Sequence, residues 1–230
     1  GNNGYYSTGQ YSKVNYPLAD YLTGNYNGSH DEFLRKHSVD YIVLDNTMKG
    51  KYSAVSQISN RDNENFQSMF SLTSCQTSGQ GCRRSQFRNS ISENNGTQVA
   101  TFQSNRVGFR AYIPLEVTSD SVEIGGAPTL QTRRGRINVG CVLTEDGRVD
   151  YETESDSGFC VVEDPYQSFE RGMSGTTSQV VVVPEEIADS NLVRLYLMNG
   201  HGMDYVEPVE EGSNGYVRMW EVNLENNSQN

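Results

Sequence analysis

The hydrophobic and polar positions near the start of this chain follow helical spacing in two segments, YPLADYL and HDEFLRKHSV. The first carries a proline in its first turn, and the second has acidic residues near its start and basic residues near its end, as the helix dipole favours. The apolar run DYIVLD then predicts a short buried strand, and TMKGKYSAVSQIS predicts a helix that leaves it. The order helix, strand, helix indicates an α/β unit.

The middle of the chain has a different pattern. Residues 63–72 predict one more helix, with Phe66, Met69 and Phe70 packing on one face. Beyond it, short β-branched runs are separated by Gly, Asn, Asp and Pro about every 8–12 residues, which predicts an antiparallel sheet or barrel. The runs are TQVATFQS, VGFRAYIPLEV, DSVEIGG, GRINVGCVL, GRVDYETE, GFCVVED and SQVVVVP.

The helical period returns at the end of the chain. PEEIADSNLVRLYLM has Pro184 and two glutamates in its first turn, and the glycine-containing NGHG follows it, so a helix is predicted there. The alternating runs MDYVEPVE and GYVRMWEV then predict a β-hairpin.

Together these patterns predict an α+β fold. A mixed α/β core is expected from residues 1–74 and 184–230, with residues 75–183 forming a β-rich insertion, an antiparallel sheet or barrel. Two side-by-side domains are the alternative, and that arrangement requires a polar linker near residue 184. The segment VVVPEEI is too apolar for such a linker, which favours the insertion.

Length and charge restrict the partners that the chain can have. Its 230 residues are enough to bury a sizeable core. The formal net charge of −11 has the same sign as nucleic acid, so nucleic acid is not expected as a partner. The apolar runs fall short of the ~20 residues needed to cross a bilayer, and no signal peptide opens the chain. We therefore expect a soluble piece.

The four cysteines, Cys75, Cys82, Cys141 and Cys160, form two closely spaced pairs along the sequence. Of the three possible pairings we expect the local one, which closes two hairpins with disulfides and indicates an oxidising compartment. Four reduced, buried thiols are the alternative, since a domain tolerates free buried cysteine.

The motifs of common enzyme classes are missing from the sequence. His30, His37 and His201 have neither HExxH nor metal-ligand spacing, and no GxSxG, P-loop or GxGxxG motif occurs. This argues against a zinc enzyme and a serine hydrolase. The acidic pair Glu185 and Glu186 suits a helix start better than an acid–base pair.

The best candidate for chemistry is DNTMKGK, residues 45–51. At about 100° per residue, Met48, Lys51 and Val55 form one stripe on the predicted helix. Asp45 lies at the carboxyl end of the predicted strand, where its side chain can cap that helix. One interpretation needs no function: Asp45 is a cap, Met48 and Val55 belong to the core, and Lys51 extends its stem along the surface.

The other interpretation rests on a resemblance. The stretch from Asp45 to Lys51 resembles the short archaeal DxxMxxK motif in the C-terminal globular domain of the oligosaccharyltransferase catalytic subunit. The preceding HSVDYIVLD, the segment VRLYLMNGHGMDYVEPV and the run GYVRMWEV are also similar to segments of archaeal members of that family. The resemblance covers the two ends of the chain, and residues 75–183 have no counterpart in it.

This resemblance implies that the chain is one part of a membrane glycosyltransferase of protein N-glycosylation. The full enzyme would transfer a lipid-linked oligosaccharide to asparagine in Asn-x-Ser/Thr acceptors, using a divalent metal, Mg or Mn, held outside this part. N-terminal spans would attach it to the membrane, and this domain would lie on the extracellular face. Asp45, Met48 and Lys51 would bind the Ser or Thr two residues after the acceptor asparagine, with Met48 against the threonine methyl group.

The resemblance also implies what the chain lacks. In the family a WWDYG motif completes the Ser/Thr pocket, whereas this chain has one tryptophan, Trp220, outside any such motif. No catalytic residue, cofactor or metal ligand is therefore expected here, and the chain alone should be inactive.

Two other functions remain open. The first is an extracellular carbohydrate-binding or adhesin-type module without catalysis, suggested by the β-rich middle, the cysteine pairs and 14 tyrosines that could stack on sugars. The second is a secreted hydrolase with an unrecognised carboxylate pair.

Overall fold

The computed structural model describes residues 11–60, 67–79, 81–104, 108–152, 158–209 and 215–224. The chain divides into two compact units: a terminal unit, residues 1–68 and 187–230, and a middle unit, residues 69–186. Helices and strands both contribute substantially, which confirms the predicted α+β class. In the parts of the chain that the structure describes, no helix is long and apolar enough to cross a membrane.

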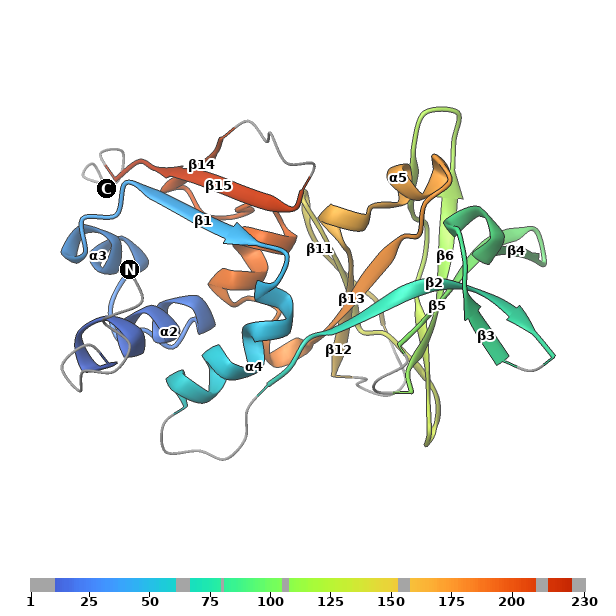
Figure 1. Ribbon diagram of the computed structural model, residues 1–230, viewed down its shortest axis with the longest axis horizontal. Coiled ribbons are helices and arrows are strands. Elements are labelled where there is room, and N and C mark those ends of the chain that lie inside the picture. Colours follow the sequence, from blue (N-terminus) through green and yellow to red (C-terminus); the bar gives the residue numbers. More distant parts are fainter. Residues whose placement is uncertain are drawn as a thin grey trace. The chain divides into compact units, whose positions relative to one another are not determined.

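Two helices of the terminal unit, α2 and α3, have ends that the sequence signals (Figure 1). The Ser29 side chain caps α3 by accepting a hydrogen bond from the Glu32 N–H, and Gly24 ends α2 with a φ of +80°. The described elements of this unit are η2 (Tyr11–Asn15), α2 (Tyr16–Thr23), α3 (His30–Lys36), β1 (Tyr41–Asp45), α4 (Met48–Ser59), η6 (Val193–Leu197), β14 (Val206–Pro208) and β15 (Val217–Val222).

The strands of the terminal unit form an antiparallel sheet in the order β1-β15-β14. The pairing of β14 with β15 confirms the predicted hairpin. The prediction that DYIVLD forms a buried strand was wrong, because β1 lies at the end of this strand order and is covered on one side. Leu44 is buried, whereas Tyr41 and Val43 are 53% and 56% exposed. One-sided burial is usual for an antiparallel sheet.

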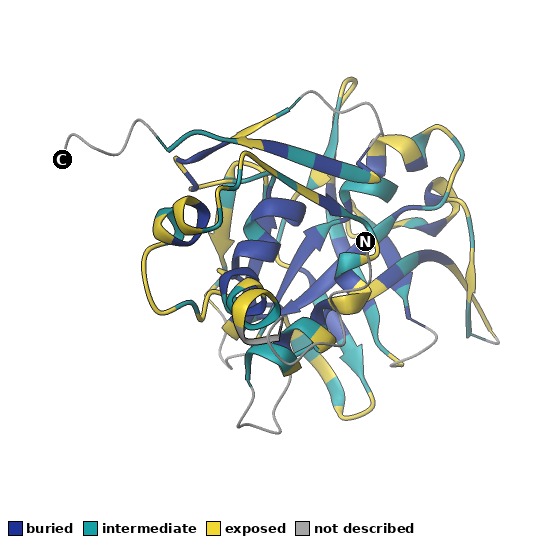
Figure 2. Ribbon diagram, turned by 60° about the vertical axis from the view of Figure 1, so that its left-hand side comes forward, coloured by how far each residue is buried: buried dark blue, intermediate teal, exposed yellow. Residues whose placement is uncertain are grey.

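The helix predicted to begin at Pro184 begins later. The valine run continues strand β13 through Pro184, a short 3₁₀ turn, η5 (Glu185–Ile187), follows, and helical structure starts at residue 191. From residue 191 to 198 every residue except Arg194 is buried. This buried helix is the dark blue helix near the centre of Figure 2. A helix that is apolar on almost all sides is typical of a core position.

The middle unit is built around one 12-stranded sheet. The strand order is β11-β10-β12-β13-β2-β5-β6-β8-β9, with β3 on β2, β4 on β5 and β7 on β6. Every described pair is antiparallel except β10 with β12. The strands are β2 (Phe70–Ser78), β3 (Gly81–Arg84), β4 (Ile91–Asn94), β5 (Thr97–Gln103), β6 (Arg110–Val117), β7 (Val122–Ile124), β8 (Thr129–Thr132), β9 (Gly135–Asn138), β10 (Cys141–Thr144), β11 (Gly147–Asp150), β12 (Phe159–Glu163) and β13 (Gln179–Pro184).

The helix predicted over residues 63–72 is not formed in its described part. Phe66 lies outside the described residues, and Phe70 begins strand β2. Leu72 and Ser74 are buried as β2 pairs with β13 and β5. Pairing with β13 from Phe70 onward outweighs the helical spacing of the segment's apolar residues.

The core of the middle unit contains a cluster of three aromatic rings. Phe169 from α5 (Phe169–Met173) stacks on Phe87 from η3 (Phe87–Ser90), with ring centroids 5.0 Å apart, and lies 5.8 Å from Phe102. A Cβ atom on Gly172 would lie 1.9 Å from Ser178 Oγ and 2.6 Å from Phe87 Cβ. The absence of a side chain at position 172 therefore lets α5 approach the ring cluster. A further short turn, η4 (Pro165–Gln167), leads into α5.

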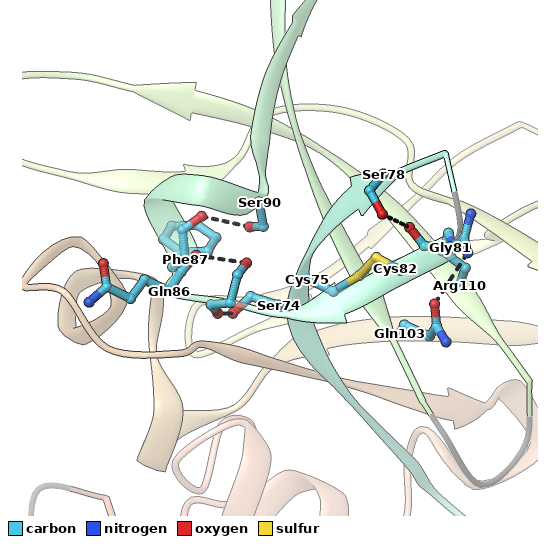
Figure 3. The surroundings of a disulfide bond; sticks show 11 residues. Ser74, Cys75, Ser78, Gly81, Cys82, Gln86, Phe87, Ser90, Gln103 and Arg110 are labelled. Atoms are coloured by element: carbon cyan, nitrogen blue, oxygen red, sulfur yellow. Dashed lines mark hydrogen bonds between the residues drawn. A yellow bond between two sulfur atoms is a disulfide. The ribbon is translucent and has the colours of Figure 1, made fainter.

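Both disulfides lie in the middle unit and have the local pairing. Cys75–Cys82 joins β2 to β3, with Ser78 and Gly81 at the end of the same hairpin (Figure 3). Cys141–Cys160 joins directly paired positions of β10 and β12, whose Cα atoms are 4.5 Å apart, and both residues are fully buried. The local pairing was therefore predicted correctly, but only Cys75–Cys82 closes a hairpin as expected, because β10 and β12 are parallel neighbours and the hairpin partner of β10 is β11.

Glu163 lies at the end of β12, close to the start of α5. Its Oε1 accepts a hydrogen bond from the Phe169 N–H at 2.5 Å. Burial raises the pKa of the Glu163 carboxyl to about 7, and the nearby acids Glu170, Glu145 and Asp164 act in the same direction. The folded chain therefore keeps the proton of this carboxyl up to a higher pH than the unfolded chain does.

We predict that this carboxyl makes the chain less stable as the pH rises. Because its folded pKa exceeds the unfolded value of 4.5, the stabilisation is complete below about pH 4.5 and is lost as the pH rises towards about 7. Glu163→Gln keeps an acceptor for the Phe169 N–H and should remove a pH-dependent loss on the order of 1–3 kcal/mol. Urea unfolding at about pH 5 and pH 8 measures this.

The control is Glu123→Gln on β7, where the side chain is exposed. It should leave the pH dependence of the unfolding free energy unchanged. An identical pH dependence for the parent chain and Glu163→Gln would show that Glu163 is not the titrating group.

Candidate functional site

The candidate site lies where β1 passes into α4. Asp45 is the last residue of β1 and pairs with Val217 of β15. Its Oδ1 accepts hydrogen bonds from the Thr47 N–H, at 2.8 Å, and from the Thr47 hydroxyl. These bonds, with smaller contributions from Lys51 and the Met48 N–H, lower the pKa of the Asp45 carboxyl. Asp45 is therefore a carboxylate at neutral pH that holds the first turn of α4.

Helix α4 buries a different stripe from the one that carries Met48. Lys49, Tyr52 and Ser56 are buried, at 7%, 0% and 2% exposed. Met48 is half-buried and Lys51 is exposed. Because the two stripes differ by one residue, or about 100° around the helix, Met48 and Lys51 lie beside the buried face.

This arrangement corrects the interpretation in which the residues of the DNTMKGK segment and Val55 have structural roles alone. That interpretation placed Met48 and Val55 in the core, whereas both are only half-buried and Tyr52 occupies the core position. The structure also corrects the role of Asp45: the N-cap of α4 is Thr47, and Asp45 lies two residues before it and accepts hydrogen bonds from the Thr47 N–H and hydroxyl. The exposed Lys51 agrees with either interpretation.

Two contacts fix the rotation of α4 about its own axis. Lys49 Nζ lies 5.7 Å from the ring centroid of Tyr196 in η6, a distance suited to a cation–π contact. Ser56 Oγ accepts a hydrogen bond from the Gln67 N–H at 3.2 Å. The burial of Lys49 was missed from the sequence, although its three-residue spacing from Tyr52 is a signal that could have indicated it.

Tyr216 is a further neighbour of the site that the sequence did not single out. Its carbonyl oxygen accepts a hydrogen bond from the Asn46 N–H at 2.9 Å, next to the turn that Asp45 holds. The side chain is 41% exposed. An aromatic residue therefore borders the entry to α4, on the chain segment just before β15.

The described residues contain one group with the geometry of metal ligands, formed by Cys141, Asp150 and Glu185 in the middle unit. Cys141 is in a disulfide. Asp150 and Glu185 both pair with Arg148, whose Nε lies 2.6 Å from Asp150. A disulfide sulfur is a poor ligand for a divalent ion, and both carboxylates are already engaged by the Arg148 guanidinium, so the group does not suit such an ion.

The histidines that the sequence named do not form a site. His30 Nδ1 hydrogen-bonds with Asn191 at 3.0 Å and packs against Tyr21 and Tyr205, and burial lowers its pKa. The Asn191 side chain also donates to the Tyr21 carbonyl. His30 therefore contributes to the packing of the terminal unit.

Truncating a side chain on the buried stripe of α4 should lower the free energy of unfolding more than truncating one on the half-buried stripe. Tyr52→Ala should destabilise the chain by about 3–5 kcal/mol because it leaves a cavity in a closed core. Met48→Ala should cost less than about 1.5 kcal/mol because its side chain is partly in solvent. Urea unfolding of both variants measures the difference, and equal losses would place Met48 in the core after all.

Comparisons with known proteins give little further information. No model of a known protein family matches the chain, and no curated protein matches it. Among solved structures, the C-terminal domain of PglB from C. jejuni matches with 12% sequence identity and a TM-score of 0.38, over 91% of this chain and 68% of that one. This similarity is too low to assign a function.

Proposed function

We propose that the chain is the outer-face globular part of a membrane oligosaccharyltransferase. In this proposal Asp45, Met48 and Lys51 help to bind the Ser or Thr two residues after the acceptor asparagine. The observation that carries it is the rotation of α4: the helix buries Lys49 and Tyr52 and leaves the DxxMxxK stripe partly or fully in solvent.

The chemistry of these side chains suits an acceptor hydroxyl with a methyl group beside it. A thioether packs against a methyl group at low cost. The ionised Asp45 and the ammonium group of Lys51 can accept and donate hydrogen bonds at the rim of the same surface. The extra methyl group of threonine would then contribute about 0.8 kcal/mol relative to serine.

The rest of the reaction lies outside this chain in our proposal. The lipid-linked oligosaccharide and the divalent metal, Mg or Mn, would be bound by membrane-side parts of the full enzyme. The Cys141, Asp150 and Glu185 group offers no substitute for that metal site, for the reasons given above. The domain would act at the extracellular face of the membrane, on acceptor proteins.

Met48→Ala in the full-length enzyme should impair threonine acceptors more than serine acceptors. Loss of the methyl contact predicts a drop of about fourfold in the Thr-to-Ser ratio of kcat/KM. Peptides that differ only in Ser or Thr at this position measure the ratio. The control is Gln57→Ala, an exposed position about 180° around α4 from Met48, which should leave the ratio unchanged. An equal loss for both acceptors would return Met48 to a structural role.

The chain by itself should transfer no glycan. An assay with a lipid-linked oligosaccharide, an Asn-x-Thr peptide and Mg²⁺ or Mn²⁺ should give no glycopeptide, since this proposal places the reacting groups elsewhere. Turnover by the isolated chain would refute that division of the chemistry. The full-length enzyme in the same assay is the positive control.

A further inference from the structure

A cavity of about 430 Å³ with both polar and apolar walls opens on the sheet of the middle unit. Its volume is within the range of about 300–1,000 Å³ that is usual for small-molecule sites. Strands β4, β5, β6, β8 and β9 contribute to its walls, and several of these are labelled in Figure 1. No sequence motif indicated such a site.

The strand register explains why these residues gather. Thr101 of β5 pairs with Tyr112 of β6, and Tyr112 pairs in turn with Thr129 of β8. The three side chains therefore form a row on one face of the sheet. A second row, two residues away on the same face, contains Ser92, Val99 and Pro114. The alternate positions Ala100, Ile113 and Leu130 belong to the core on the opposite face.

Arg136 is held over this floor by two contacts. Its Cζ lies 4.8 Å from the ring centroid of Tyr112, and its Nε donates a hydrogen bond to Thr129 Oγ1 at 2.9 Å. Neither contact uses its two terminal amino groups. Among the residues that the structure describes, no carboxylate forms an ion pair with this guanidinium. A positioned set of donors therefore faces the cavity.

The opposite rim supplies acceptors. Asn94 lines the cavity from the end of β4, two residues after Ser92 and on the same face of the sheet, and it is exposed. Thr77 reaches it from the β2–β3 hairpin that Cys75–Cys82 closes (Figure 3). The lining thus combines a guanidinium, an amide and several hydroxyls with an apolar floor.

We infer that this cavity binds a short, neutral oligosaccharide. Sugar hydroxyls both donate and accept hydrogen bonds, which suits a lining of both kinds. The apolar floor of Val99, Pro114 and the Tyr112 ring suits the C–H face of a sugar ring. The chain's formal net charge of −11 disfavours polyanions, which favours neutral glycans as ligands. The inference goes beyond the proposed function and does not depend on it.

Glycan binding by the 230-residue chain tests this inference. The probe is an array of neutral and acidic oligosaccharides, and the tightest neutral binder is then titrated by calorimetry. Arg136→Ala and Tyr112→Ala should each weaken binding by about tenfold, the loss of one good polar or stacking contact. Arg136→Lys keeps the charge but loses the fixed fork of donors, and it should also weaken binding.

The matched control is Arg134→Ala, which removes an exposed arginine from the β8–β9 turn outside the cavity and should leave the affinity unchanged. Unfolding midpoints near that of the parent chain establish that each variant is folded. Three outcomes would overturn the inference: no binding of neutral oligosaccharides at millimolar concentration, a preference for acidic glycans, or equal losses for Arg134→Ala and Arg136→Ala. None of them bears on acceptor recognition by Met48, which the Thr-to-Ser ratio tests separately.

Discussion

The pairing of β1 with β15 is the constraint on which the candidate site depends. It brings together residues that are 180 positions apart in the sequence, such as Tyr41 and Glu221. The ladder continues through Asp45, which pairs with Val217, and the Asn46 N–H then donates to the Tyr216 carbonyl. The backbone that leads into α4 is therefore fixed on one side by the far end of the chain. Closing so long a loop costs conformational entropy, which the buried side chains of this sheet, with Trp220 fully enclosed, must offset.

In the middle unit, too, strands from the two ends of the unit pair with each other. Its first long strand, β2, lies antiparallel to its last strand, β13, with Leu72 opposite Val180. The chain thus enters and leaves this unit on neighbouring strands. Within the sheet, registers that bury Ile113 and Leu130 necessarily place Tyr112 and Thr129 on the other face. The cavity is a consequence of the same alternation that builds the core.

Local signals in the sequence predicted the elements that such signals control. The first turn of α3 carries two acidic residues and its last turn two basic residues, as the helix dipole favours, and Pro17 lies in the first turn of α2. The errors arose where pairing decided the outcome. Phe70 joined a strand because it pairs with Val182 of β13, and Val43 is exposed because β1 has a described partner on one side. The row of Thr101, Tyr112 and Thr129 was beyond prediction, since it depends on the register of three strands.

The sequence placed Met48 on one stripe of α4 but did not show which stripe is buried. Burial energies explain why the stripe of Lys49, Tyr52 and Ser56 is the buried one. Rotating the helix by about 100° would bury more of Met48 and Val55 but expose the ring of Tyr52, which is now fully buried. Burying a large aromatic side chain contributes roughly 2–3 kcal/mol. Lys49 opposes this orientation, since a buried ammonium is costly, but its position over the Tyr196 ring reduces that cost. The bonds of Asp45 to Thr47 favour the observed orientation of α4, because they fix where its first turn begins. The burial of Tyr52 and the bonds of Asp45 thus determine the rotation of α4, and this rotation leaves Met48 partly and Lys51 fully accessible. The surface that an acceptor would contact on this helix is therefore determined by the side chains on its buried side.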